Sequence, residues 1–392
     1  MRRWNVGIIG CGNIADIYVI NIQTYFQNLQ IRSCAARHLE SARRLAEKYG
    51  IPHAVTVEEI LADGEIDVVL NLTVPDVHYE LNRRALLAGK HVYSEKPLAG
   101  NYEEVQELAK LAGQMGKRIG CAPDTWFGSG IQTCRKLLDE GAIGKVTSFS
   151  ANMLRPGVEI WHPEPWSTYA KGAGPILDMG PYYVTALVAL LGPVERVYAF
   201  SIRDEEKKRI YSKPHEGEFL PVEIDTVYQC ILKFRSGVIG SLHMDGGSWE
   251  SKLPKIEIHG TGGTLQVSDP NCFDGEIELY SGERILRETE DLEGLPRIMK
   301  IDRLPEWYTR EEIPRAWQME TDNFRGIGLW DMMTAIAEGR EHRNNSSLIL
   351  HVMEVLCKLN AGEGNPDPVI HSDCRMPEMV SWKSFAEAEK HS

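Results

Sequence analysis

The stretch GIIGCGNIA at residues 7–15 decides the fold that this sequence predicts. Its first residues are typical of a buried parallel strand, and a helical pattern follows from Asn13. Gly10 allows a tight turn, Gly12 lets the backbone approach a pyrophosphate, and the small Ala15 lets helix and strand pack closely. The N–H groups and the positive dipole end of the helix favour phosphate at this point. The residues predicted to bind a dinucleotide here are Gly10, Gly12, Asn13 and Ile14.

Strand and helix patterns alternate over roughly the first 120 residues. The apolar segments that read as strands are residues 5–10, 31–36, 67–72, 91–97 and 118–122. Repeated strand–helix units of this length are typical of a doubly wound parallel sheet, so we predict an α/β Rossmann domain over residues 1–123. This context favours a dinucleotide site over the alternative, a glycine turn in an unrelated α/β fold.

The pattern changes after residue 123 to strands that are joined mostly by short turns. The predicted strands are residues 145–153, 194–202, 225–234, 237–244, 255–260 and 263–268, with helices near 129–140, 179–191, 323–338 and 346–358. This pattern predicts an α+β domain over residues 124–392 with a large, predominantly antiparallel sheet. Self-association is one way to cover the open face of such a sheet. Residues 285–315, charged and interrupted by prolines, are predicted to form a long surface loop.

Composition excludes several classes of function. The formal net charge of −13 at pH 7 argues against a nucleic-acid partner. The eight cysteines form no CxxC pair and no His/Cys cluster has zinc spacing, so we expect reduced thiols and no metal. No stretch has the length and apolar character of a membrane span, and the first apolar run is too short and glycine-broken for a signal peptide. We therefore expect a cytoplasmic protein with no membrane partner.

The end of the second predicted strand bears on the choice between NAD and NADP. An acidic residue there would hold the ribose 2′-hydroxyl of NAD, and this sequence has none. Ala36 leaves room instead, and Arg37 followed by His38 can meet a 2′-phosphate. The pattern slightly favours NADP. In the alternative, Arg37 is a solvated loop charge and NAD binds.

Three further motifs accompany the glycine turn: NLTVPDVHYE at residues 71–80, GKHVYSEKPLA at residues 89–99 and GPILDMGPYY at residues 174–183. With them, nearly the whole chain resembles the Gfo/Idh/MocA oxidoreductase family, which includes glucose–fructose oxidoreductase and inositol dehydrogenase. The resemblance implies a nicotinamide cofactor in the first domain. It also implies a homodimer or homotetramer built through the antiparallel sheet, and substrates that are mostly sugars, sugar derivatives, polyols and small alcohols.

The resemblance also assigns cofactor-binding residues after the third and fourth predicted strands. Glu95-Lys96-Pro97 matches the family's EKP motif, in which the lysine reaches both the nicotinamide ribose and the substrate. The segment 71–80 passes the nicotinamide side of the cofactor in the family. The residues of these two segments that we expect at the cofactor are Asn71, Thr73, Pro75, His78, Glu95 and Lys96.

The expected catalytic histidine is replaced. Asp178 and Gly180 match the family's DxGxH pattern, but Tyr182 stands where the histidine usually lies. Hydride transfer from a carbinol needs a base for the hydroxyl proton. Because free tyrosine has a pKa of about 10, it would need a nearby ammonium such as Lys96 to favour the phenolate. The alternative for Tyr182 is a wall residue that only packs, with His162 as the acid/base.

A proline-rich loop before Asp178 carries the other candidates for substrate binding. Trp161 and Trp166 offer aromatic faces to a sugar ring, and His162 can donate to its hydroxyls. The alternative is a structural loop whose tryptophans fill gaps. Asp178 itself can orient a hydroxyl, assist the base or cap the helix that follows it. Two other residues predicted to contact the substrate are Asp124 and Tyr183.

Three functions remain open from sequence. The favoured one is an NAD(P)-dependent oxidoreductase that transfers a hydride between the cofactor and a hydroxyl carbon of a sugar, glycoside or cyclitol. The second is a glycoside hydrolase that holds NAD(H) and uses transient oxidation, elimination and re-reduction. The third is a non-catalytic, cofactor-sensing binding protein, against which Lys96 and Asp178 argue.

Overall fold

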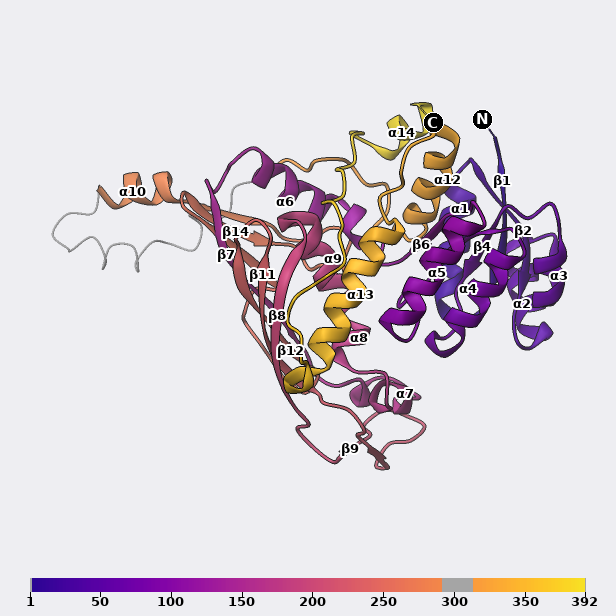
Figure 1. Cartoon of the computed structure of the whole chain (residues 1–392), viewed down its shortest axis with the longest axis horizontal. Coiled ribbons are helices and arrows are strands. Elements are labelled where there is room, and N and C mark those ends of the chain that lie inside the picture. Colours follow the sequence, from indigo (N-terminus) through magenta and orange to yellow (C-terminus); the bar gives the residue numbers. More distant parts are fainter. Residues whose placement is uncertain (1, 291–312, 392) are drawn as a thin grey trace. The chain divides into compact units, whose positions relative to one another are not determined.

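The computed structural model describes residues 2–290 and 313–391, and these form two compact units (Figure 1). The segments of the first unit are Met1–Phe127, Met319–Cys357 and Ser372–Ser392, and those of the second are Gly128–Gln318 and Lys358–His371. Two late segments therefore pack with the N-terminal residues, although the sequence pattern grouped them with the second domain. The division of the chain into domains at residue 123 stays a prediction.

The first unit is built on a six-stranded parallel sheet with the strand order β3-β2-β1-β4-β5-β6. Its strands are β1 (Trp4–Ile9), β2 (Leu29–Ala35), β3 (His53–Val55), β4 (Val68–Asn71), β5 (His91–Ser94) and β6 (Ile119–Cys121). The predicted Rossmann-type sheet is confirmed, and β3 is a three-residue strand that the sequence pattern did not indicate.

The order of the strands creates a switch point between β1 and β4. From β1 the chain adds β2 and β3 on one side, and β4, β5 and β6 on the other. Connections therefore diverge at this point, which is where open α/β sheets bind ligands. The register pairs Ile9 with Asn71 and Asn71 with Ser94, so the loops after β1, β4 and β5 leave the sheet at one level.

The helices of the first unit pack through apolar side chains, most of them onto the sheet. They are α1 (Asn13–Thr24), α2 (Leu39–Tyr49), α3 (Val57–Ala62), α4 (His78–Leu87), α5 (Tyr102–Gln114), α12 (Ile327–Glu338) and α14 (Phe385–His391). Apolar side chains of α3, α4 and α5 form one buried cluster with the strands, including Ile60, Leu86 and Leu108. A further helix, α13 (Ser346–Asn360), contains the boundary between the two units.

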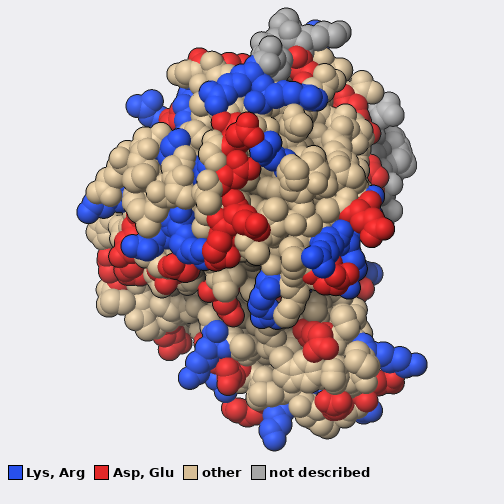
Figure 2. Space-filling view, turned by 90° about the vertical axis from the view of Figure 1, so that its right-hand side faces the viewer, with Lys and Arg blue, Asp and Glu red and all other residues tan. Residues whose placement is uncertain are grey.

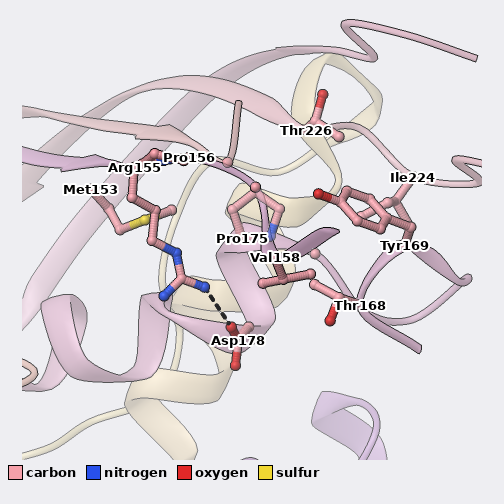
Figure 3. Close-up of a pocket in the computed structure, with 13 residues that line it drawn as sticks. Met153, Arg155, Pro156, Val158, Thr168, Tyr169, Pro175, Asp178, Ile224 and Thr226 are labelled. Carbon is pink, nitrogen blue, oxygen red and sulfur yellow. Dashed lines mark hydrogen bonds and ion pairs between the residues drawn. The ribbon is translucent and has the colours of Figure 1, made fainter. Parts of the chain in front are cut away.

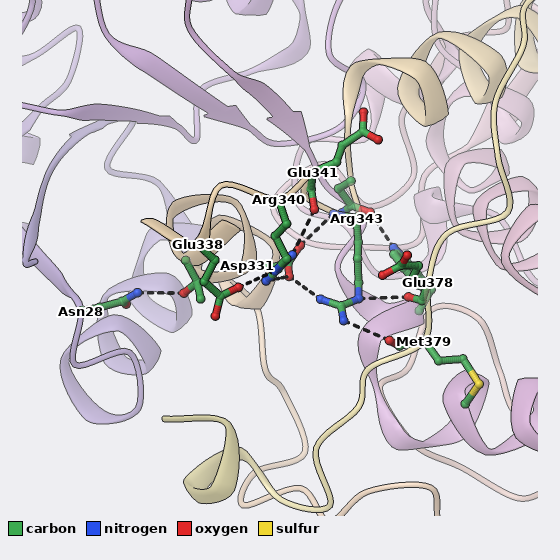
Figure 4. Close-up of polar contacts among 11 residues, drawn as sticks. Asn28, Asp331, Glu338, Arg340, Glu341, Arg343, Glu378 and Met379 are labelled. Carbon is green, nitrogen blue, oxygen red and sulfur yellow. Dashed lines mark hydrogen bonds and ion pairs between the residues drawn. The ribbon is translucent and has the colours of Figure 1, made fainter. Parts of the chain in front are cut away.

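A buried carboxylate ties α12 to later segments of the first unit. Figure 4 shows Asp331 between Arg340 and Arg343, which both pair with its Oδ1 atom. The backbone N–H of Arg343 donates to Asp331 Oδ2 at 2.8 Å. The guanidinium of Arg343 also donates to the carbonyls of Glu378 and Met379, each at 3.0 Å. Asp331 is fully buried, and these partners offset the free-energy cost of removing its carboxylate from water.

The second unit is built on a seven-stranded sheet with the order β15-β14-β13-β7-β12-β11-β8. Its strands are β7 (Val146–Leu154), β8 (Val194–Ile202), β11 (Val227–Phe234), β12 (Ile239–Asp245), β13 (Ile256–Gly260), β14 (Gly263–Val267) and β15 (Glu278–Ser281). The predominantly antiparallel sheet is confirmed, with one parallel pair, β7 and β12. A small ribbon, β9 (Lys207–Arg209) and β10 (Phe219–Pro221), stands apart from it.

One face of this sheet is packed and the other is open. The strand β11 alternates buried and exposed residues, as a half-covered sheet requires. The helices of this unit are α6 (Ser129–Asp139), α7 (Trp166–Tyr169), α8 (Pro175–Asp178), α9 (Gly180–Leu191) and α10 (Gly282–Glu290). The loop predicted over 285–315 is helical at its start in α10, and residues 291–312 lie outside the described ranges.

The described surface mixes charges of both signs. Figure 2 shows Lys and Arg interspersed with Asp and Glu over the face in view. All eight cysteines are free thiols. Within residues 2–290 and 313–391, no helix combines the length and the apolar character that crossing a bilayer requires.

Candidate functional site

The glycine turn after β1 is built so that only glycine fits at its first position. Gly10 has a φ of +108°, which L side chains rarely adopt. A Cβ there would lie 2.4 Å from the backbone carbon of Leu72, in the loop after β4. The Gly10 N–H donates to the carbonyl of Ala35 at the end of β2, at 2.8 Å. The turn therefore links the ends of three strands at the switch point.

The start of α1 fits a dinucleotide phosphate. Gly12 is the N-cap of this helix and provides no side-chain cap, and a Cβ built on it would meet nothing within 4 Å. Asn13 is exposed and Ile14 half-buried in the first turn. Unpaired N–H groups beside open space at a helix N-terminus suit an anion. These are the residues predicted to hold the pyrophosphate, and the structure brings them together.

We expect Gly10→Ala to abolish dinucleotide binding. The added methyl group would force the turn away from Leu72, and the positive φ adds backbone strain. Titration with NAD⁺ and NADP⁺ by calorimetry should show an affinity loss of at least about 100-fold, for a misfit of roughly 3 kcal/mol. Gly64→Ala, where a Cβ meets nothing within 4 Å, is the matched control and should bind as the unaltered protein does. Equal affinities for the two variants would contradict a phosphate site in this turn.

The residues after β2 are arranged as the sequence suggested. The strand ends at Ala35, with Ala36 half-buried and Arg37 exposed beside it. No carboxylate stands at this strand end in the described chain before Glu40, which lies in the first turn of α2. The position predicted to face the adenine ribose therefore offers a cation and no acid.

The loop after β4 is held by two polar side chains that face inward. Asn71 is buried, its Nδ2 donates to Asn82 at 2.9 Å, and its Oδ1 accepts from the Thr73 hydroxyl at 2.7 Å. The ring of His78 is also buried, with Nδ1 2.7 Å from the Pro97 carbonyl and Nε2 2.9 Å from that of Thr73. Both residues were predicted at the cofactor, and the structure places them in support of the loops after β4 and β5.

Of the same segment, two residues are more accessible than Asn71 and His78. Thr73 is half-buried, and Pro75 is exposed at the first position of a short 3-10 helix, η1 (Pro75–Val77). Their place beside the switch point is consistent with a segment that passes a bound cofactor.

Lys96 is the second residue after β5, and the adjoining Glu95 is fixed by a tyrosine that sequence reasoning did not single out. Tyr18, fully buried in α1, donates to Glu95 Oε1 at 2.8 Å. The backbone N–H of Lys96 donates to Glu95 Oε2 at 3.0 Å, and that of Glu95 donates to the Asn71 carbonyl at 2.8 Å. Burial and the Glu95 carboxylate raise the pKa of Tyr18 well above its usual range, so it remains a donor. The Lys96–Pro97 peptide is cis.

Asp124 lies inside the first unit. It accepts from the Tyr93 hydroxyl and, at 2.7 Å, from the Gly326 N–H. Burial raises the pKa of this carboxyl to about 6, while the Tyr93 and Gly326 hydrogen bonds oppose that rise. The contacts described for Asp124 are with residues of its own unit. We therefore do not include Asp124 among the substrate-binding residues that we propose.

The second unit contributes a pocket at the end of β7 (Figure 3). Asp178, the last residue of α8, lines it, and the guanidinium of Arg155 lies against this carboxylate with Nη2 3.3 Å from Oδ2. Sequence reasoning missed Arg155, although a charged residue directly after a strand was a usable signal. Thr168 and Tyr169 line the same pocket and were also missed.

The two tyrosines after Asp178 differ in their surroundings. Tyr183 is buried in α9, and its hydroxyl donates to the Asn152 carbonyl at 3.2 Å. Burial raises the pKa of Tyr183 far above its usual range, which suits this structural contact. Tyr182 is 9% exposed, near the start of the same helix. Both tyrosines are therefore buried, and Tyr182 is the less completely enclosed of the two.

The proline-rich loop places its aromatic residues in different environments. Trp161 is exposed, and its ring meets that of His162 edge-on at 5.4 Å. His162 Nδ1 accepts from the Glu164 N–H at 3.0 Å. Trp166 begins α7 and packs against a small buried cluster that includes Ile210 and Leu220. This packing agrees with the alternative in which the tryptophan fills a gap in the structure. In the described residues, no group of three His, Cys, Asp or Glu side chains is placed to hold a metal ion.

Comparison with known proteins identifies both parts of the chain. Residues 4–122 match the model of an oxidoreductase family with an NAD-binding Rossmann fold, and residues 131–266 match that of the GFO/IDH/MocA C-terminal domain. Similar curated proteins include a 1,5-anhydro-D-fructose reductase of Ensifer adhaerens, 28% identical over 68% of this chain and 75% of that protein. A D-xylose dehydrogenase of Paenarthrobacter nicotinovorans is 29% identical over 78% of each.

Solved structures share the fold. A levoglucosan dehydrogenase in complex with NADH superposes with a TM-score of 0.74 at 20% identity, over 96% of this chain and 100% of that one. An NAD-binding oxidoreductase from Klebsiella pneumoniae gives 0.72 at 23% identity, over 95% and 100%.

Proposed function

Because the chain belongs to the Gfo/Idh/MocA family of oxidoreductases, we propose that it transfers a hydride between a nicotinamide cofactor and a hydroxyl carbon of a sugar, glycoside or cyclitol. The observation that carries the proposal is the glycine turn at the switch point, together with Lys96 after β5, the second strand from β1 in the sheet. The names of the two curated relatives, a sugar-derivative reductase and a xylose dehydrogenase, support the substrate class.

In this proposal the cofactor, when bound, supplies the hydride acceptor or donor. The phosphates lie on Gly10, Gly12 and the first turn of α1. Lys96 holds the reacting oxygen and the nicotinamide ribose, and Glu95, clamped by Tyr18, fixes the backbone from which Lys96 projects. Its ammonium stabilises negative charge on the substrate oxygen as the proton leaves.

The proton needs a second residue. We propose Tyr182 as the acid/base, with His162 as the alternative, and Asp178 as the residue that orients a neighbouring hydroxyl. The variants Tyr182→Phe and His162→Gln separate the two assignments. We expect kcat for oxidation to increase with pH as the base loses its proton, and only the variant that lacks the base should lose this increase. The hydrolase alternative has no observation in its favour among the relatives described above.

The proposal is tested by incubating the protein with NAD⁺ or NADP⁺ and a panel of sugars, polyols and p-nitrophenyl glycosides. Absorbance at about 340 nm follows reduced cofactor, and chromatography follows the aglycone. Net reduction in step with sugar loss supports the proposal. Aglycone release without net reduction contradicts it.

Within this function we propose NADP as the slightly preferred cofactor. The exposed position of Arg37, two residues after the end of β2, supports this preference, because a guanidinium there can pair with a 2′-phosphate. Arg37→Ala is expected to lower kcat/KM for NADP⁺ about fivefold, since one exposed charge-assisted contact is worth roughly 1 kcal/mol, and to leave NAD⁺ unchanged. Arg43→Ala, an exposed arginine of α2, is the control. An equal effect of Arg37→Ala on both cofactors would contradict the assignment.

We also propose that the open face of the large sheet assembles the chain into a homodimer or homotetramer. Five large apolar residues on this face are more than half exposed: Tyr198, Phe200, Ile202, Ile231 and Ile239. Phe200→Glu is expected to shift the mass measured by light scattering to that of the single chain, because a buried unpaired charge disfavours the contact. A single-chain mass before substitution would contradict the proposal. The eight free thiols support a cytoplasmic location.

A further inference from the structure

We propose that Cys11 and Cys34 are a modification site: hydrogen peroxide joins them in a reversible disulfide, which lowers the affinity of the glycine turn for the dinucleotide. No motif of the sequence assigns this role to either residue. The effect on the dinucleotide rests on the proposed function, because it takes the turn as the phosphate site. Formation of the disulfide depends only on where the two thiols lie.

Both thiols lie at the end of β2. Cys34 is the last residue but one of this strand and is fully buried, whereas Cys11 lies between the two glycines of the turn and is half-buried. The Gly10 N–H donates to the Ala35 carbonyl at 2.8 Å, and the Cys11 thiol donates to the same oxygen at 3.4 Å. The turn therefore holds the Cys11 sulfur against the residue that follows Cys34.

The two sulfurs also contact each other. The Cys11 thiol is hydrogen-bonded to Cys34, whose Sγ lies 3.3 Å from the carbonyl oxygen of Ala42 in α2. The bond from Cys11 lowers the pKa of the Cys34 thiol, because it stabilises the thiolate, while burial opposes this shift. The same bond, with burial, raises the pKa of Cys11 well above its usual range. The pair therefore combines a thiolate with a second thiol in contact with it, as disulfide formation requires.

Oxidation of the pair consumes one molecule of hydrogen peroxide. The remaining proton can pass along the hydrogen bond to Cys34, so that Cys11, the more accessible sulfur, attacks a peroxide oxygen. The O–O bond breaks, Cys11 becomes a sulfenic acid, and the released hydroxide takes up a proton to give water. The Cys34 sulfur then attacks the sulfenic sulfur, the S–S bond forms, and the S–O bond breaks to release a second water. Exchange with excess thiol reduces the disulfide again.

Formation of the disulfide displaces the turn more than the strand. The bond brings the sulfurs to about 2 Å from each other, closer than a hydrogen bond does. Cys34 is held in β2, where it pairs with Ile8 of β1 on one side and with Ala54 of β3 on the other. Cys11 lies in a loop, and a Cβ built on the adjoining Gly12 would meet nothing within 4 Å. The displacement therefore falls on Cys11 and on the start of α1 next to it.

The N–H groups at the start of α1 are those that we assign to the dinucleotide phosphates. We expect the oxidised chain to bind NAD⁺ and NADP⁺ about tenfold more weakly or worse, since misplacing a positioning group by about 1 Å can cost up to about 100-fold. By linkage, bound dinucleotide should disfavour the disulfide by the same factor. The two factors are measured independently and should agree.

The disulfide is detected by peptide mapping of the full chain after treatment with hydrogen peroxide and blocking of the remaining thiols with iodoacetamide. Trypsin cleaves after arginine, so Cys11 leaves in the peptide of residues 4–32 and Cys34 in that of residues 33–37, unless a disulfide joins them. We expect the joined peptides, and their separation after dithiothreitol. Calorimetry measures the affinity for the dinucleotide before oxidation, after it and after reduction.

The reciprocal effect is measured in buffers with a graded ratio of glutathione disulfide to glutathione. Each Cys11–Cys34 disulfide formed there consumes one glutathione disulfide and releases two molecules of glutathione. The fraction of joined peptides is compared with and without excess NADP⁺. We expect the dinucleotide to shift this equilibrium toward the free thiols by the factor found in calorimetry.

Two variants locate the effect. Cys34→Ser removes the thiol that lies in the strand and not in the turn; it should give no joined peptides, and before oxidation it should bind the dinucleotide as the unaltered protein does. Cys357→Ser is the matched control. Cys357 is another half-buried thiol of the first unit, whose pKa burial raises to about 11, and this variant should form the disulfide and lose affinity as the unaltered protein does. Thermal melting checks that both variants are folded.

The inference is supported when the joined peptides form, the affinity falls about tenfold or more, and dithiothreitol restores it. It is overturned when the two peptides stay separate under peroxide that oxidises the exposed Cys272, or when the disulfide forms and the affinity is unchanged. Joined peptides from a chain whose reduced form binds neither NAD⁺ nor NADP⁺ would instead contradict the proposed function and leave the modification site standing.

Discussion

Lys96→Met is expected to lower kcat/KM for the best sugar by about 10³-fold, because it removes the ammonium that stabilises charge on the reacting oxygen. The loss should fall on kcat more than on KM, since that charge develops in the transition state. Glu95 keeps its bonds to Tyr18 and to the backbone N–H of residue 96 in this variant, so the fold of the strand end should survive. Steady-state kinetics and thermal melting check the two parts.

Lys110→Met is the matched control for this change, because Lys110 is an exposed lysine on α5 of the same unit. We expect it to retain full activity. Lys96→Arg preserves the charge but not its compact shape, and should fall between the two. Activity of Lys96→Met within a few-fold of the unaltered protein would contradict the place that we give this residue.

Asp331→Ala should lower the free energy of unfolding of the first unit by about 3–5 kcal/mol, the usual loss when a buried ion pair keeps one side only. Arg340 and Arg343 would lose the carboxylate that both share, and Arg343 is itself 9% exposed. Arg343 holds the C-terminal segment through the Glu378 and Met379 carbonyls. In this variant the backbone amides of that segment should therefore lose protection from hydrogen exchange first. Urea denaturation followed by hydrogen exchange measures both effects.

Glu338→Ala is the control for the stability change. Glu338 also pairs with Arg340, but its side chain is 39% exposed, and such surface pairs are worth roughly 0–1 kcal/mol. Equal losses for Asp331→Ala and Glu338→Ala would show that burial of the pair does not govern its contribution.

The parts of the fold that are determined by residues close together in the sequence were predictable. The glycine turn, five of the six strands of the parallel sheet and the strands β7, β8, β11, β12, β13 and β14 all follow local apolar patterns. The strand β3 was missed because its three residues, His53–Val55, are only partly buried and form no apolar run, whereas the equally short β6 is fully buried. The parallel pairing of β7 with β12 was missed because it joins residues about ninety positions apart, and no local pattern encodes such a register.

The site was predictable only where a motif carried it. The glycine turn and Lys96 each follow a strand of the parallel sheet, as their motifs suggested, whereas Arg155 meets Asp178 across 23 residues of chain and has no motif. His78 shows the opposite limit. Its place in a motif suggested the cofactor, but the ring bonds to the carbonyls of Thr73 and Pro97, which only the folded loops bring within reach.

The measurement that tests the central claim most directly is the fate of the hydrogen on the oxidised carbon. The sugar that gives turnover in the panel is prepared with deuterium at that carbon. The nicotinamide cofactor is then recovered and its molecular mass is determined by mass spectrometry. We predict reduced cofactor that carries the deuterium, in an amount equal to the oxidised sugar, and about 10³-fold slower formation of it with Lys96→Met. Sugar consumed with deuterium released to water, or with no reduced cofactor, would contradict hydride transfer by this protein.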